Sequence, residues 1–146
     1  YLESMINKHI IGLKITTTNE NNQAQEDLVQ LWKSFYDQEN AELQTVKKEP
    51  YTYVVYTNYQ WDFEQGNYDC YLGVASESTL TGFASCDIKL EKYQIFDFPY
   101  YSPQDTFEAR KTIRSNQSLK RAYLADLEIY DFEHNRLQII ISTIED

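Results

Sequence analysis

The order of the predicted secondary-structure elements repeats once along the chain, and this repeat limits the folds that the sequence can adopt. In each half, one strand candidate comes first, an amphipathic helix follows, and two further strand candidates complete the unit. Such a unit packs one helix against a small antiparallel sheet, so the sequence predicts an α+β fold. The strand candidates are residues 9–17, 51–59, 68–76, 86–98, 121–132 and 136–144.

The duplicated β-α-β-β order predicts one domain over residues 1–146, with pseudo-symmetric halves at about 1–80 and 81–146. We expect both helices on one side of the antiparallel sheet and a central ligand cleft between the halves. The candidate at 86–98 is long for one strand, so a bend is expected near Glu91 or Lys92. The last two strand candidates are expected to form a closing hairpin.

The two predicted helices differ in the strength of their apolar faces. The first is expected to begin at Asn22, a suitable N-cap residue. The second is expected to begin at Ser102, with Pro103 at its first position and Asp105 near its N-terminal dipole, and to run to about residue 115. The face of the first helix consists of Ala24, Leu28, Leu31, Trp32 and Phe35, and the thinner face of the second consists of Phe107, Ala109 and Ile113.

The strand candidate "LADLEIYDF" at residues 124–132 carries a carboxylate, Glu128, in its middle. Side chains alternate along a strand, so Asp126, Glu128 and Tyr130 share one face, while the aliphatic face could pack under the helices. An acid beside aromatic rings suits an organic cation, because ring faces attract cations by about 0.5–2 kcal/mol. From the residues alone, Glu128 could equally point to water.

The other candidate chemistries have weak support. The two histidines, His9 and His134, have no metal-ligand spacing, and Cys70 and Cys86 form no zinc or redox motif. The sequence therefore predicts no metal, no cofactor and no catalytic residue. Five basic residues, expected to form a solvated helix face, are Arg110, Lys111, Arg114, Lys120 and Arg121.

The net charge of −10 repels nucleic-acid phosphates, so direct nucleic-acid binding by this segment is not expected. No apolar run approaches the roughly 18 residues of a membrane span, and a reduced, cytoplasmic setting is the expectation. The chain has 13 tyrosines, and tyrosine can line a cavity that is neither fully dry nor fully wet.

Five stretches, in order along nearly the whole chain, make the sequence resemble the GyrI-like effector-binding domain family, in particular its integron-associated, AraC-type effector-binding branch. The resemblance implies a duplicated β-α-β-β fold whose central cleft binds lipophilic, often cationic, small molecules. The stretches are "IIGLKITTTNEN" at 10–21, "LVQLWKSFY" at 28–36, "YVVYTNYQWD" at 53–62, "GNYDCYLGVAS" at 66–76 and "LKRAYLADLEIYD" at 119–131.

In this family a glutamate on the penultimate strand lies deep in the cleft, and the matching residue here is Glu128. We expect Glu128 to be buried among rings, with no counter-ion from the protein itself. Phe107 stands where many relatives carry a Trp. The expected ligand-binding aromatic residues are Trp32, Tyr56, Tyr59, Tyr68, Tyr93, Tyr130 and Phe107.

The resemblance favours a binding module that senses a small-molecule ligand, either alone or behind an upstream DNA-binding domain that would precede Tyr1. The alternative is a GyrI-like hydrolase of cyclopropane-bearing compounds, in which Glu128 would serve as the acid–base group. A third, weaker alternative follows the members that bind a target enzyme through surface loops. The sequence favours binding over catalysis, and it leaves open whether the chain forms a homodimer.

Overall fold

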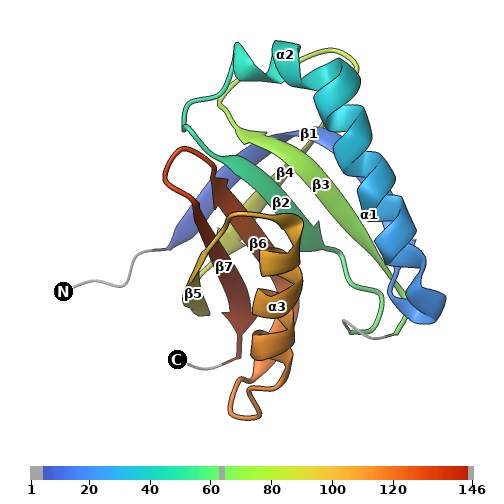
Figure 1. Cartoon of the computed structure of the whole chain (residues 1–146), viewed down its shortest axis with the longest axis vertical. Helices are drawn as coiled ribbons and strands as arrows, with labels where there is room; N and C mark the ends of the chain where they lie inside the picture. The colour runs from blue at the N-terminus through green and yellow to red at the C-terminus, as the bar shows by residue number, and fades with distance from the viewer. Residues whose placement is uncertain (1–4, 63–64, 145–146) are drawn as a thin grey trace.

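The computed structural model describes residues 5–62 and 65–144, and its strands form a curled antiparallel sheet in the order β4-β1-β3-β2-β6-β7-β5 (Figure 1). The α+β class and the predicted order of strands and helices are confirmed, while the division into halves near residue 80 stays a prediction. The strands are β1 (Ile6–Thr18), β2 (Thr52–Thr57), β3 (Asn67–Ala75), β4 (Ala84–Leu90), β5 (Tyr93–Pro99), β6 (Arg121–Asp131) and β7 (Arg136–Thr143).

The strand predicted at 86–98 bends at the expected place, and the bend shapes the whole sheet. Before Glu91 the chain forms β4, which pairs with β1 at one edge of the sheet. After Lys92 it forms β5, which pairs with β7 at the other edge. Because only two residues join the two edges, the sheet must curl. β6 and β7 form the predicted closing hairpin.

The first helix, α1 (Gln23–Ser34), continues through a π-helical turn over Phe35–Glu39 into α2 (Asn40–Gln44). Asn22 stands at the N-cap position as predicted, but it lies in the left-handed region with φ of 58° and its side chain makes no capping hydrogen bond. The second helix, α3 (Pro103–Arg114), has the predicted start: the Ser102 hydroxyl and the Asp105 carboxylate form a capping box. No helix within the described residues is long and apolar enough to cross a membrane.

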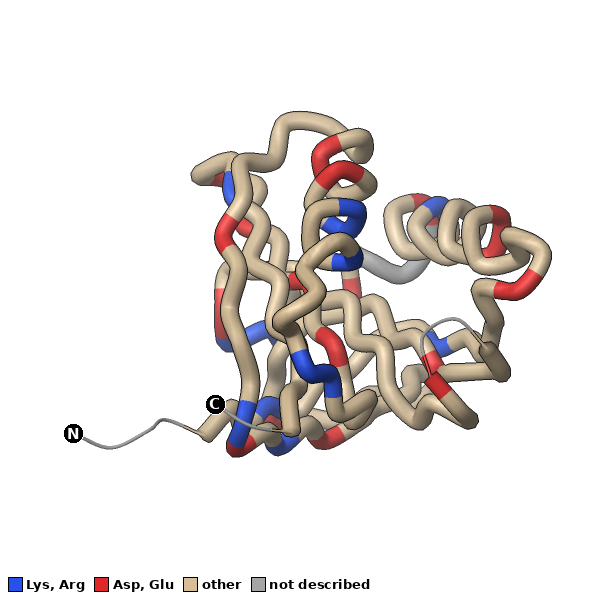
Figure 2. The backbone as a smooth tube through the Cα atoms, turned by 90° about the horizontal axis from the view of Figure 1, so that it is seen from below, with Lys and Arg blue, Asp and Glu red and all other residues tan. Residues whose placement is uncertain are grey.

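The sheet separates two cores, and both main helices lie on the same side of it (Figure 2). On the helix side, Leu31 and Phe35 of α1 and Ile113 of α3 join one apolar cluster with residues of the sheet. On the other side, Leu127 and Ile140 lie in a cluster enclosed by the curl of the sheet itself. The aliphatic face of β6 therefore fills the curl instead of packing under helices, and the face that carries Glu128 lies toward α1 and α3.

Candidate functional site

Glu128 lies in the middle of β6, between Val54 of β2 and Ile139 of β7, and only 2% of its surface is exposed. Its oxygens accept three hydrogen bonds. Tyr130 Oη donates to Oε1 at 2.6 Å, and Tyr56 Oη donates to Oε2 at 3.3 Å. The third donor is a guanidinium. A buried carboxylate needs such partners, because an unpaired one would cost several kcal/mol.

That guanidinium belongs to Arg110, which the sequence placed on a solvated helix face. Arg110 instead lies on the inner side of α3, with 13% of its side chain exposed, and Nε donates to Glu128 Oε2 at 2.8 Å. The guanidinium carbon lies 4.8 Å from the ring centroid of Tyr56, which is a cation–π contact. Burial lowers the pKa of Arg110, but the neighbouring acidic groups, Glu128 first among them, together raise it more, so the pKa lies well above its usual value.

A second carboxylate and a second guanidinium complete an ion cluster of Arg110, Arg121, Asp126 and Glu128. Asp126 is 1% exposed and lies two residues before Glu128 on the same face of β6. Its Oδ2 atom contacts Nη2 of Arg121, lies 3.5 Å from Nη1 of Arg110, and accepts a hydrogen bond from Tyr59 Oη at 3.0 Å. The two positive and two negative charges balance, so the expectation of a glutamate without a protein counter-ion is wrong.

A bulge in β6 explains how Arg121 reaches this face. Regular strand alternation would place the side chains of Arg121 and Tyr123 on one face of β6 and that of Asp126 on the other. However, the pairing with β7 shifts between Arg121 and Asp126, and Tyr123 has a positive φ of 57°. The Ser142 hydroxyl accepts the backbone N–H groups of residues 124 and 125 inside the bulge. The bulge thus turns the Arg121 side chain to the face of β6 that carries Asp126.

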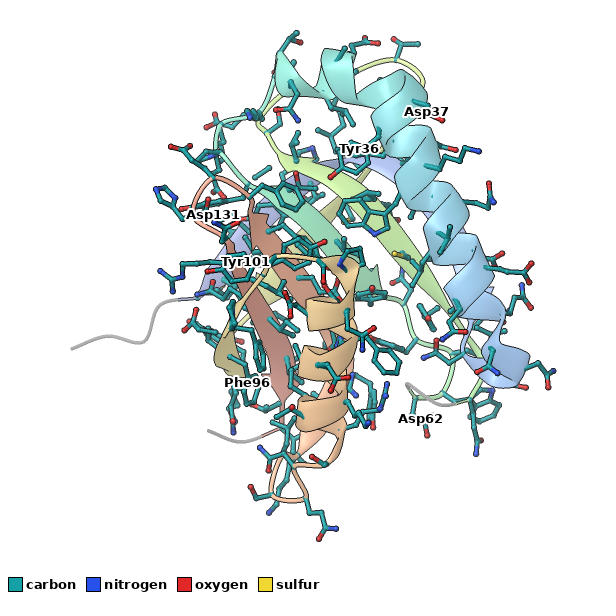
Figure 3. The ribbon with its side chains drawn as sticks, in the orientation of Figure 1. Tyr36, Asp37, Asp62, Phe96, Tyr101 and Asp131 are labelled. Carbon is teal, nitrogen blue, oxygen red and sulfur yellow. The ribbon has the colours of Figure 1, made fainter. Side chains whose placement is uncertain are left out.

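One group of aromatic rings flanks Glu128 toward α1. The Trp32 ring meets the Tyr130 ring edge-on at 5.3 Å between centroids and stacks on Tyr36 at 5.7 Å. Tyr100 also meets Tyr130 edge-on, at 5.1 Å. Tyr36 is about half exposed, and Figure 3 shows its side chain directed away from α1 toward the other half of the molecule. These rings lead from solvent to the buried carboxylate.

A second group of rings lies on the other side of the ion cluster. The Tyr68 ring contacts Tyr56 at 5.9 Å and Tyr59 at 5.5 Å, and Tyr123 contacts Tyr59 at 5.8 Å. Burial, together with the nearby carboxylates Asp126 and Glu128, raises the pKa of Tyr59 and Tyr56 well above 10. These phenols are therefore neutral hydrogen-bond donors at physiological pH.

A family model described as integron-associated effector binding protein, Cass2, matches residues 2–142. The chain belongs to this family. An integron cassette protein from the mobile metagenome of Vibrio cholerae has 25% identity and a TM-score of 0.77, with 95% of this chain and 92% of that chain covered. A search of curated protein sequences found no match.

Two further solved structures share the fold at lower identity. One is SAV2435 bound to tetraphenylphosphonium, with 16% identity, a TM-score of 0.72, and 94% of this chain and 91% of that chain covered. The other is a Staphylococcus aureus protein described as acting in transcription regulation, with 16% identity, a TM-score of 0.70, and 94% of each chain covered. At this identity the likeness shows the Cass2-like fold alone.

Of the eight predicted ligand-binding residues, the structure of this Cass2 family member gathers six around the ion cluster and leaves two elsewhere. Tyr93 lies on the opposite face of the sheet, against the core inside the curl. Phe107 is 48% exposed on α3, whereas Thr106 and Arg110 of the same helix contact Tyr130 and Glu128. The six are Trp32, Tyr56, Tyr59, Tyr68, Glu128 and Tyr130.

Arg110 and Arg121 are the charged site residues that sequence reasoning missed, and Tyr36, Tyr100 and Tyr123 are the aromatic ones. The signal for Arg110 was the thin apolar face of α3, since Thr106, Arg110 and Ile113 recur at the helical period on one side. Two acids on one face of a neighbouring strand also call for buried positive partners. For Arg121 the sequence held no such signal, because no residue type near Tyr123 marks the bulge that changes the side-chain alternation there.

Two hollows of the structure lie away from the ion cluster. One, of about 390 Å³, is on the curl side and is lined in part by Tyr53, Leu127 and Ile140. The other, of about 410 Å³, lies between α1 and β1. Among residues 5–62 and 65–144, no group of three His, Cys, Asp or Glu side chains is placed to hold a metal ion.

Proposed function

We propose that this domain binds a lipophilic organic cation between α1 and α3, with the charge of the ligand paired to Glu128. One observation carries the proposal: the chain's own guanidinium, on Arg110, already lies between the Glu128 carboxylate and the Tyr56 ring. A buried carboxylate and an aromatic face are the two groups that stabilise an organic cation out of water. The site is therefore chemically matched to such a ligand.

The aromatic rings supply the lipophilic part of the proposed ligand site. Trp32, Tyr36 and Tyr100 offer ring faces between solvent and Tyr130, and ring-to-ring contacts add about 0.5–1.5 kcal/mol each beyond area burial. Membership of an effector-binding family supports ligand binding as the role. The tetraphenylphosphonium held by SAV2435 is a cation with four phenyl rings, and it is a suitable probe ligand for this chain.

We favour binding over hydrolysis, because both oxygens of Glu128 accept hydrogen bonds from Tyr130, Tyr56 and Arg110. A carboxylate committed to three donors holds a charge in place, whereas a general base must be free to take a proton from water. In this view the domain is the ligand-sensing unit of a cytoplasmic protein, alone or with a DNA-binding domain before it. Ligand binding would act by shifting a conformational equilibrium.

The test is a calorimetric comparison of two ions that share a shape and differ in charge. Tetraphenylphosphonium and tetraphenylborate both carry four phenyl rings around one charged atom. In sodium buffer we expect the wild-type chain to bind the phosphonium about tenfold or more tighter than the borate, because charge complementarity sets specificity. Equal affinity, or tighter binding of the borate, would contradict a cation site.

A further inference from the structure

We propose that Arg110 is an internal cation that competes with the ligand for Glu128, and that it transfers to Asp126 when a ligand binds. This inference rests on the proposed function, and it adds a residue that sets affinity and a movement that reports occupancy. Three observations carry it: the position of Arg110, the acceptor left open on Asp126, and the attachment of Arg110 to α3.

Arg110 occupies the contacts that the ligand's charged group would need. Its Nε is 2.8 Å from Glu128 Oε2, and its guanidinium carbon is 4.8 Å from the Tyr56 ring centroid. Glu128 already accepts hydrogen bonds from Arg110, Tyr56 and Tyr130, so a ligand cation added beside it would face the Arg110 charge at short range in a site of low dielectric. A cationic ligand therefore reaches Glu128 only after Arg110 has left it, and the apparent affinity is reduced by the fraction of molecules in which Arg110 is engaged.

Asp126 provides a second position for the displaced guanidinium. Nη1 of Arg110 is already 3.5 Å from Asp126 Oδ2. The other oxygen of this carboxylate, Oδ1, is buried and accepts no hydrogen bond from any described residue. A buried carboxylate oxygen without a donor costs free energy, so a donor that moves onto it gains a charge-assisted bond. Arg110 can thus leave Glu128 and remain paired, which lowers the cost of displacement.

The same side chain links ligand occupancy to a helix. Arg110 and Thr106 lie one turn apart on α3, and they contact Glu128 and the Tyr130 hydroxyl respectively. These are polar ties between α3 and the face of β6 that carries the site. When a ligand pairs with Glu128, the contact of Arg110 with Glu128 is replaced by a contact with Asp126. The position of α3 over β6 then changes, and a partner domain could detect that change.

Removal of Arg110 is the direct test, with tetraphenylphosphonium as the probe. Arg110→Met keeps an unbranched apolar stem and deletes the guanidinium with its charge. Lys111→Met deletes the same charge from the next residue of α3, which is exposed. We expect Arg110→Met to tighten phosphonium binding about tenfold or more relative to the wild type, and Lys111→Met to change it less than about twofold.

The outcomes separate this inference from the proposed function. If the wild type binds the phosphonium and Arg110→Met binds it equally or more weakly, Arg110 is no competitor and the inference is overturned, while the cation site stands. If neither protein binds the phosphonium, the proposed function itself fails. If Arg110→Met and Lys111→Met tighten binding equally, the effect is general electrostatics, and the inference is again overturned.

A measurement on the wild-type chain keeps the inference testable if Arg110→Met does not fold. The Arg110 Nε–H group gives a resonance in proton–nitrogen NMR spectra that can be assigned by its loss in Arg110→Lys. We expect this resonance to shift or broaden as tetraphenylphosphonium saturates the protein, because Nε loses Glu128 as its acceptor. Saturation that leaves the resonance unmoved would show that Arg110 stays on Glu128, and would overturn the inference.

Discussion

Arg110 and Glu128, 18 residues apart in the sequence, meet with Nε 2.8 Å from Oε2 at the centre of the candidate site. The pair joins the inner side of α3 to the face of β6 that lies under both helices. It makes the site electrically balanced, and it shows what kind of charge the surrounding rings accept. In the proposed function, ligand binding exchanges one cation for another and does not fill an uncompensated acid.

The coupling between these two residues should be measurable as stability. Removing one partner of a buried ion pair typically costs about 3–5 kcal/mol, because the other charge is left buried. We expect Arg110→Met and Glu128→Gln each to lower the free energy of unfolding by about 3 kcal/mol. The double variant should cost at least about 1 kcal/mol less than the two single costs together. Urea unfolding followed by circular dichroism gives these values, and strictly additive losses would show that the pair is not coupled.

Tryptophan fluorescence should report ligand entry from one side of the site. The sequence has two tryptophans: Trp32 touches the Tyr130 ring edge-on, while Trp61 is 69% exposed. We expect a cationic aromatic dye to quench the fluorescence of Trp61→Phe, in which Trp32 remains. The same titration on Trp32→Phe should give little saturable quenching. The reverse pattern would place the ligand away from α1.

Alkaline pH should destabilise the domain through its buried phenols. Burial and the neighbouring Glu128 raise the pKa of Tyr56 and Tyr130 well above 10. In the unfolded chain these groups ionise near pH 10, whereas in the folded chain they stay neutral. The stability that they contribute is therefore fully present below about pH 10 and is lost as the pH rises above it.

The measurement is urea unfolding at several values between about pH 8 and about pH 11, with phenolate absorbance recorded in parallel. Tyr56→Phe cannot ionise at that position, so its stability should fall less steeply with pH. If the phenolate absorbance shows that every tyrosine ionises while the protein is still folded, Tyr56 and Tyr130 are not held neutral by burial.

The sequence predicted the fold well, because strands and helices are set by local patterns. Runs of apolar, β-branched and aromatic residues between turn residues located the strands, and Ser102, Pro103 and Asp105 located the start of α3. The bend near Glu91 was expected from the length of the run alone. The continuation of α1 through a π-helical turn into α2 was missed, since residues 37–44 are mostly polar and the spacing of Ala41 and Leu43 shows no helical period.

The site was predicted only in part, because its charges are paired through tertiary contacts. Burial of Glu128 followed from the resemblance, because the residues alone left its exposure open. The pairing with Arg110 depends on how α3 is rotated over the sheet, and a thin apolar face does not fix that rotation. The position of Arg121 beside Asp126 depends on the bulge near Tyr123. This bulge reverses the side-chain alternation that was used to assign the faces of β6.

The most direct test of the cation site compares Glu128→Gln with Glu133→Gln by isothermal titration calorimetry with tetraphenylphosphonium. Both variants lose one negative charge, but Glu128 is buried in the ion cluster and Glu133 is exposed in the β6–β7 turn. We expect Glu128→Gln to weaken binding about tenfold or more and Glu133→Gln to bind like the wild type. Equal affinity of Glu128→Gln and the wild type would contradict the central role of Glu128.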